Sequence, residues 1–307
     1  MKPDPDRCLR DLLRMAVLVM LSAGLAACTI GPHGRSDTAG GPESAASSPE
    51  IVAALDRAAL AALVIGPQRS PEHIARNAAR HPLATLEFFG LERDMTVLEA
   101  LPGGLWYGEI IAPYVREKGQ YIAASYDVTL PDRPDYQIRL HEAMLARFES
   151  EPESFGGARI AKLSPPKSVE LGPSGSVDLV LTFRNMHGWV RDGVEDEVLD
   201  AFYEVLKPGG VLGIVQHRAG PRSHPQKFIG YLREERVIAM AEAAGFELEA
   251  RSEINANPRD TADYPGGVWT LPPSLRLGDE DRERYEAIGE SDRMTLRFRK
   301  PRNVAAR

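Results

Sequence analysis

Hydrophobic positions between residues 51 and 299 follow two alternating patterns. Seven strands are predicted, at 95–99, 120–124, 158–163, 177–183, 211–215, 246–254 and 293–299, with short apolar runs clearest at 95–99 and 177–183. Between them, apolar residues recur at helical spacing, most regularly at Val198, Leu199, Phe202, Val205 and Leu206. Further helices are expected at 71–81, 134–150 and 233–244. The first of these starts with Ser70 as its N-cap and Pro71 in its first turn.

Strands that alternate with helices of ten or more residues indicate βαβ units, and unbroken apolar runs indicate strands covered on both faces. The fold class we predict is therefore α/β, with a doubly wound, mostly parallel sheet of seven strands. In such sheets ligands bind beyond the carboxyl ends of the strands. The residues that directly follow each strand are thus the first candidates for a functional site.

The amino terminus has the pattern of an export signal. Four basic residues precede an apolar run at 15–27, which is too short to span a bilayer: Lys2, Arg7, Arg10 and Arg14. The run ends in Leu25-Ala26-Ala27-Cys28, which resembles the lipobox of bacterial lipoprotein signals. That resemblance implies that residues 1–27 are a signal peptide and that Cys28 is lipidated. A simple cleavable signal, or an anchor with an incidental cysteine, is the alternative.

Composition narrows the possible functions. The net charge of −7, with Lys and Arg scattered through the chain, gives no basic surface for nucleic acid. Cys8 and Cys28 are the only cysteines, so the main domain has no disulfide, thiolate metal site or cysteine nucleophile. No dense histidine spacing predicts a metal site, and no Gly-x-Ser-x-Gly sequence predicts a hydrolase. Residues 28–49, rich in Gly, Ser, Pro and Ala, are typical of a flexible tether before a domain at 50–307.

The strand at 95–99 is followed by an acid and a glycine pair. The sequence is Glu99-Ala-Leu-Pro102-Gly103-Gly104-Leu-Trp-Tyr107. Glycines permit a tight turn and a close approach of a ligand to the backbone, and a carboxylate at a strand end can accept hydrogen bonds from hydroxyls or an ammonium group. Later in the chain, Phe183-Arg184-Asn185 precedes Val205-Leu-Lys-Pro-Gly-Gly210 by about twenty residues.

These motifs resemble class I S-adenosylmethionine-dependent methyltransferases, over about residues 95–299. The first motif is similar to that of a little-characterised bacterial group of predicted methyltransferases with exported members. The resemblance implies an antiparallel last strand and S-adenosylmethionine as the cofactor. It assigns cofactor binding to the residues Glu99, Pro102, Gly103, Gly104, Asp127, Arg184 and Asn185. The chain departs from the family pattern at Leu101 and Leu105, where the family has glycine two and six positions after the acid.

Other polar residues after strands are candidates for the acceptor side. His187 could act as a general base, or could hydrogen-bond a loop instead, and Trp189 could wall a flat or apolar substrate. His217 and Arg218 could bind an anionic substrate group, or could be solvated. The long segment from residue 255 to 292 carries Asn255, Asn257, Asp260 and Trp269, and it could form a lid or simply pack over the sheet.

The function expected from these features is methyl transfer from S-adenosylmethionine to a small or lipid-like acceptor. The expected location is the periplasmic side of the outer membrane, where Cys28 would attach the chain to the lipid, although the cofactor is made in the cytoplasm. The alternative is a periplasmic ligand-binding lipoprotein that keeps the methyltransferase fold without catalysis. A nicotinamide oxidoreductase is disfavoured because no Gly-x-Gly-x-x-Gly follows the first strand. The sequence does not indicate an oligomeric state.

Overall fold

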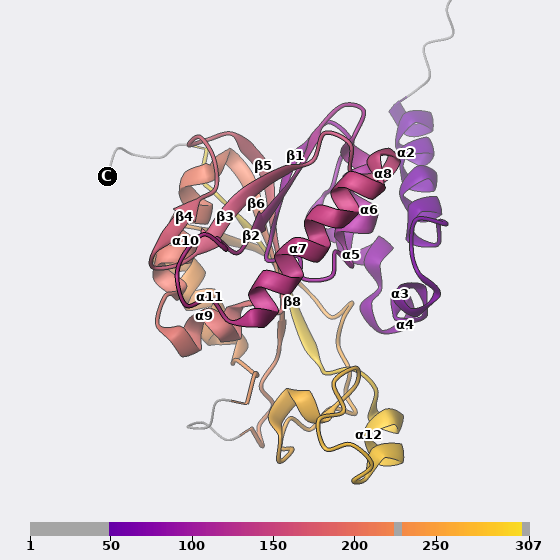
Figure 1. The fold of residues 1–307 in the computed structure, drawn as a ribbon, viewed down its shortest axis with the longest axis vertical. Helices are drawn as coiled ribbons and strands as arrows, with labels where there is room; N and C mark the ends of the chain where they lie inside the picture. Colours follow the sequence, from indigo (N-terminus) through magenta and orange to yellow (C-terminus); the bar gives the residue numbers. More distant parts are fainter. Residues whose placement is uncertain (1–48, 224–228, 303–307) are drawn as a thin grey trace, which may run out of the picture. The chain divides into compact units, whose positions relative to one another are not determined.

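A mixed sheet of eight strands forms the core of the described chain, in the order β4-β3-β2-β1-β5-β6-β8-β7 (Figure 1). The computed structural model describes residues 49–223 and 229–302. The strands are β1 (Thr96–Ala100), β2 (Gln120–Ser125), β3 (Arg159–Ser164), β4 (Ser168–Glu170), β5 (Val177–Phe183), β6 (Leu206–His217), β7 (Glu247–Ser252) and β8 (Arg293–Arg299). β8 is antiparallel to β6 and β7, and β4 is antiparallel to β3; the other pairs are parallel.

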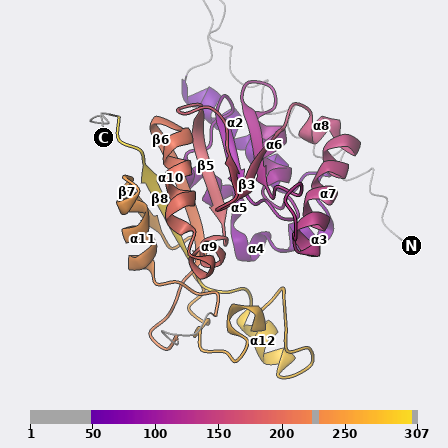
Figure 2. The ribbon, with the colours of Figure 1, turned by 60° about the vertical axis from the view of Figure 1, so that its left-hand side comes forward.

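Helices cover both faces of the sheet (Figure 2). One face packs against α9 (Met186–Asp192), α10 (Glu195–Val205) and α11 (Glu234–Ala243). The other packs against α2 (Pro49–Val64), α5 (Pro82–Phe89), α6 (Gly108–Val115), α7 (Asp135–Ser150) and α8 (Pro152–Phe155). Two short helices, α3 (Pro71–Ala75) and α4 (Asn77–Arg80), precede α5, while η1 (Gly267–Thr270) and α12 (Arg282–Ile288) lie between β7 and β8.

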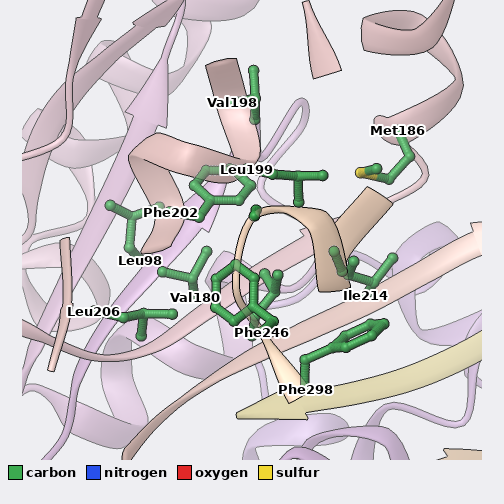
Figure 3. Packing of buried hydrophobic residues seen from close by; sticks show 14 of the residues in the cluster. Leu98, Val180, Met186, Val198, Leu199, Phe202, Leu206, Ile214, Phe246 and Phe298 are labelled. Atoms are coloured by element: carbon green, nitrogen blue, oxygen red, sulfur yellow. The ribbon is translucent and has the colours of Figure 1, made fainter. Parts of the chain in front are cut away.

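Successive side chains of a strand point to opposite faces, and both faces of the central strands are apolar. In β1, Leu98 joins the core beneath α9–α11, whereas Val97 joins the core beneath α2, α5 and α6. Figure 3 shows Phe202 of α10 packed within the first of these cores, among residues that include Leu98 and Val180. This two-sided burial leaves the carboxyl ends of the strands as the edge where polar residues can gather.

The predicted fold class is confirmed, with small differences in the elements. The strands at 177–183 and 293–299 have the expected bounds, but β6 begins at Leu206 instead of 211. Leu206 pairs with Val177, and a register shift before Leu179 accommodates the Lys-Pro-Gly-Gly turn inside the strand. The eighth strand, β4, has three residues and pairs at the edge of the sheet, so it is too short to produce an apolar run.

The helix expected at 71–81 is instead divided into α3 and α4 at Arg76. The predicted N-cap is present, because the Ser70 hydroxyl accepts a hydrogen bond from the His73 amide at 3.2 Å. At the division, Arg76 forms an ion pair with Glu290, and the Asn77 side chain donates to the Val64 carbonyl at the end of α2. Long-range contacts therefore hold the bend, and a single sequence does not reveal them.

The amino-terminal predictions, including the signal at 1–27, the tether and Cys28, lie outside the described residues. Within residues 49–223 and 229–302, no helix combines the length and the hydropathy that crossing a membrane requires.

We expect Phe202→Ala to lower the free energy of unfolding by about 3–5 kcal/mol, because the ring is fully buried in the core under α10. The matched control is Leu145→Ala on α7, whose side chain is 41% exposed and whose loss should change stability by less than about 0.5 kcal/mol. Urea unfolding followed by circular dichroism measures both. Equal losses for the two variants would contradict the packing described for α10.

Candidate active site

A cavity of about 360 Å³ lies at the carboxyl ends of β1, β5 and β6. The residues predicted from the sequence that line it are Glu99, Pro102, Gly103, Gly104, Arg184, Asn185, His187, His217 and Trp269. They come from four parts of the chain: the turn after β1, the segment after β5, the end of β6 and the long segment before β8. The expectation that polar residues after the strands converge on one site therefore agrees with the structure.

The turn after β1 exposes its backbone to this cavity. Gly103 has a φ of 57°, and a Cβ atom added to Gly103 or Gly104 would meet no other atom within 4 Å. Leu101 and Leu105, which replace the family's glycines, also have positive φ values of 46° and 62°. The backbone is therefore left-handed at both positions where the chain departs from the motif. For leucine this conformation costs roughly 1–2 kcal/mol per residue. Leu105 is itself buried, so packing offsets part of that strain.

Glu99, the last residue but one of β1, is a buried acid with few partners. Its side chain is 2% exposed, and its Oε2 atom accepts a hydrogen bond from the Tyr121 hydroxyl at 2.6 Å. Burial raises the pKa of the Glu99 carboxyl to about 7, and the Tyr121 hydrogen bond opposes this only in part. A cationic donor entering the cavity would stabilise the ionised carboxylate.

Asn185 connects the two central strands. Its Nδ2 atom donates to the carbonyl of Ala100 at 2.8 Å and to the hydroxyl of Thr182 at 3.2 Å. These contacts hold the segment after β5 against the end of β1, so Asn185 positions the floor of the cavity. Its neighbour Arg184 has a φ of 65°, which is a strained conformation for a non-glycine residue and is common at functional sites.

The contacts of His187 disfavour its predicted role as a base. Its Nδ1 atom lies 3.3 Å from Nε2 of Gln216, an amide nitrogen that also donates to the Gly230 carbonyl at 3.2 Å. Because that second bond fixes the amide orientation, Nδ1 is the acceptor and the neutral ring carries its proton on Nε2. Burial lowers the pKa of His187 to about 4. At neutral pH the ring is therefore an uncharged hydrogen-bond donor, and its role as general base stays a prediction.

His217 and Arg218, at the end of β6, have different surroundings. His217 is buried beside the cavity with Nδ1 2.6 Å from the Ser291 hydroxyl, and burial lowers its pKa well below the usual value. Arg218 does not line the cavity, since its guanidinium forms ion pairs with Glu234, Glu253 and Asp292. The prediction that Arg218 binds an anionic substrate is thus replaced by a structural role, joining β6 to the segments after β7 and before β8.

Three of the remaining acceptor-side candidates have different surroundings. Trp269 lines the cavity, and its ring contacts His187 edge to face at 5.8 Å between centroids. Trp189 is 5% exposed and packs on Phe202 in the core. It does not line this cavity but borders a second one. Asn257 does not line the cavity: its side chain donates to the carbonyls of residues 288 and 290, which anchors the segment before β8.

The long segment from 255 to 292 is both a cover and a packing unit. Trp269 and residues 272–274 line the cavity, as a lid would. Tyr264, Leu271 and Tyr285 form a small apolar cluster of their own, which stabilises the segment independently of the sheet. The lining residues agree with a cover, and the cluster shows packing within the segment, while packing over the sheet stays an alternative.

The second cavity, of about 220 Å³, adjoins the first and shares with it Leu101, Arg184, Asn185 and His187. Arg133 and Gln137 line it, and their Nε and Oε1 atoms are buried with no hydrogen-bond partner among the described residues. Unpaired buried polar atoms are costly unless a ligand or water satisfies them. Neither residue was predicted, because both lie in or before a helix and not directly after a strand.

Asp127, predicted to meet ribose hydroxyls, lines neither cavity. Its Oδ1 atom accepts a hydrogen bond from the Thr129 hydroxyl at 2.6 Å, and its Oδ2 atom accepts one from the Ser168 hydroxyl at 2.8 Å. These hydroxyls and the nearby Lys162 hold the pKa of Asp127 well below its usual value. The carboxylate therefore joins the loop after β2 to the edge strand β4, an element that the sequence pattern does not predict.

Arginines from two distant segments also reach the first cavity, and the sequence interpretation missed them. Arg76 and Arg80, from the α3–α4 region, line it together with Glu290 from the segment before β8. Glu290 forms ion pairs with both, at 2.7 Å and 3.1 Å, and with Arg293 at 3.3 Å. Burial alone would raise the pKa of Glu290, but Arg80, Arg293 and Arg76 outweigh it and lower that pKa to about 2.

Comparison with known proteins establishes the fold. No protein-family model and no curated protein matches the chain. Among solved structures, the [4+2]-cyclase SpnF aligns with a TM-score of 0.51 at 16% identity, over 83% of this chain and 96% of its own. An S-adenosylmethionine-dependent methyltransferase from Aquifex aeolicus (TM-score 0.49, 17%, 80% and 98%) and geranyl diphosphate methyltransferase in complex with S-adenosylmethionine (0.49, 13%, 78% and 94%) are also similar.

We expect Asp127→Ala to lower the thermal midpoint of unfolding and to leave the dissociation constant for S-adenosylhomocysteine within about twofold of wild type. The reason is that its carboxylate bonds Thr129 and Ser168 and not the cavities. Because the folded pKa lies below the unfolded one, the stabilisation should be present above about pH 4 and be lost as the pH falls further. A tenfold or greater loss of ligand affinity in the variant would instead support the ribose role.

Proposed function

We propose that the chain is an S-adenosylmethionine-dependent methyltransferase that acts on a small acceptor. The observation that carries this proposal is the floor of the first cavity, where the Glu99 carboxyl and the bare backbone of Gly103 and Gly104 face the same open space. A carboxylate that accepts from an ammonium group and glycines that admit a ligand to the backbone suit the methionine part of the cofactor.

The second cavity suits the nucleoside part. It adjoins the first at Leu101 and Asn185, so a ligand with two linked halves could occupy both. Gln137 and Arg133 supply an unpaired acceptor and an unpaired donor there, the chemistry that hydroxyls and ring nitrogens require. We therefore assign recognition of the nucleoside half to these two residues in preference to Asp127.

When bound, S-adenosylmethionine would supply a methyl group activated by a sulfonium. The chain's own contribution would be to hold both reactants in line and to exclude water. Trp269 and residues 272–274 line the cavity, and His187 lines it with a ring that is uncharged at neutral pH because burial lowers its pKa to about 4. With His187 neutral and a poor base, the acceptor atom would be one that is already nucleophilic at neutral pH.

We propose further that the chain is an exported lipoprotein. The support is the sequence Leu25-Ala26-Ala27-Cys28 after a basic and apolar leader, in residues outside the described structure. Thr29 after the cysteine favours the outer membrane over the inner one. The periplasm has no evident supply of S-adenosylmethionine, so a non-catalytic ligand-binding lipoprotein is the second candidate, and the absence of a strong base at His187 favours it.

The affinity for S-adenosylhomocysteine should depend on pH through Glu99. Since burial raises the pKa of its carboxyl to about 7, protonation below that pH removes its attraction for the ligand ammonium. We expect the dissociation constant to rise by about tenfold per pH unit between roughly pH 6.5 and 5.5 and to be constant above about pH 8. Titration calorimetry from pH 5 to 9 measures this.

The variant Glu99→Gln should bind about 10- to 100-fold more weakly at pH 8 and lose the pH dependence. Glu149→Gln, at an exposed position on α7, is the matched control and should behave as wild type. An unchanged pH profile in Glu99→Gln would remove Glu99 from cofactor binding.

Lipidation can be tested with radiolabelled palmitate in growing bacterial cells that express the chain. We expect incorporation in wild type, none in Cys28→Ser, and full incorporation in Cys8→Ser, because only Cys28 follows the lipobox-like sequence. Equal labelling of wild type and Cys28→Ser would contradict the lipoprotein assignment without bearing on the fold.

A further inference from the structure

The wall of the first cavity has an excess of positive charge. Arg76, Arg80 and Arg184 line it, and Arg293 lies against the same carboxylate as the first two. Glu290 is the ionised acid among them and pairs with Arg76, Arg80 and Arg293, but not with Arg184. The other lining acid, Glu99, is only partly ionised at neutral pH, because burial raises its pKa to about 7.

Arg184 is the least compensated of these cations. Among the described residues its guanidinium makes no hydrogen bond or ion pair, and its backbone holds a φ of 65°. Burial, and then the charges of Arg80 and Arg293, lower its pKa well below the usual value. A partly buried cation beside other cations opposes folding unless an anion is present.

Arg80 provides a second, independent observation. Its side chain is 2% exposed, and its Nη2 atom is buried without a hydrogen-bond partner, although Nε pairs with Glu290. The guanidinium also lies over the Trp106 ring at 4.8 Å, which fixes its plane. Nη2 of Arg76 is unpartnered in the same way. Two arginines that line the cavity therefore each have a buried Nη2 donor without a hydrogen-bond partner among the described residues.

We propose that this cavity binds an anionic oxygen group of the methyl acceptor, a carboxylate or a phosphate, through Arg184 with Arg76 and Arg80. The inference rests on the proposed methyltransferase function and names its class of substrate. Planar guanidinium groups match the oxygen atoms of carboxylates and phosphates, and a buried site strengthens such hydrogen bonds. The arginines would thus hold the acceptor by its charge, while Glu99, Gly103 and Gly104 hold the cofactor.

The first measurement is the thermal midpoint of the purified protein with inorganic phosphate, pyrophosphate or citrate, each compared with sodium chloride at equal ionic strength. We expect an increase with at least one oxyanion over chloride. In Arg184→Met the oxyanion dissociation constant should rise about 10- to 100-fold, and Arg184→Lys should retain part of the binding. Arg282→Gln, an exposed arginine on α12 paired with Glu286, is the matched control and should respond as wild type.

The ligand-free protein gives a second readout. Arg184→Met removes an uncompensated cation, so its thermal midpoint without ligand should be equal to or above that of wild type, by up to about 2–4 °C. A large decrease would show that Arg184 has a structural role and would overturn the inference. This readout separates a binding residue from one that merely maintains the fold.

Titration with S-adenosylhomocysteine distinguishes the sources of the anion. The inference moves Arg184 from the cofactor, where the family resemblance placed it, to the acceptor, so we expect Arg184→Met to bind S-adenosylhomocysteine within about threefold of wild type. If its affinity falls as much as that for oxyanions, the arginines hold the cofactor's own carboxylate and the acceptor assignment is wrong. If wild type binds S-adenosylhomocysteine and no oxyanion raises stability over chloride, the inference fails while the proposed function stands. If S-adenosylhomocysteine does not bind wild type, the proposed function fails, and the acceptor assignment fails with it.

Discussion

The position of β1 at the centre of the sheet is the constraint on which the candidate site depends. The chain proceeds from β1 to β2 and β3 on one side, and then returns to place β5 and β6 on the other. The segments that leave β1 and β5 therefore diverge, and a crevice opens between them at the carboxyl ends of the strands. The Asn185 side chain donates to the Ala100 carbonyl. This hydrogen bond holds the ends of β1 and β5 together at the floor of the cavity.

Much of the fold follows from local patterns. The run at 177–183 is apolar because both faces of β5 are covered, and this two-sided burial identifies it as an inner strand, whereas β8 at 293–299 carries three arginines among its apolar residues. Residues directly after β1 and β5 could also be chosen correctly, since the parallel topology brings strand ends to one edge. What a sequence pattern does not contain is the partner of a side chain. Asp127 follows β2, and its pairing with Ser168 appears only once the three-residue edge strand β4 is placed.

The arginines that line the cavity likewise could not be predicted from local sequence patterns. Arg76 and Arg80 lie on short helices before β1, whereas Glu290 lies more than two hundred residues later, before β8. Only the packing of those segments against each other creates the charged wall. Arg218, which follows β6 and was one of the two residues predicted to bind an anion, forms ion pairs with three carboxylates. Position after a strand indicated which residues could reach the crevice, and charge compensation decided which of them remain available.

The cavity is lined by an acid whose pKa burial raises to about 7, by two histidines whose pKa values burial lowers, and by Arg184, a cation with no ion pair among the described residues. Such an arrangement destabilises the empty protein and is expected where ligands supply the missing charges. The central claim is that the Glu99 and glycine end of this space holds S-adenosylmethionine. Titration calorimetry of the wild-type protein with S-adenosylhomocysteine at pH 8 tests it most directly. The account predicts saturable binding of one ligand per chain at micromolar to submillimolar concentration, and the absence of binding at millimolar ligand would contradict it.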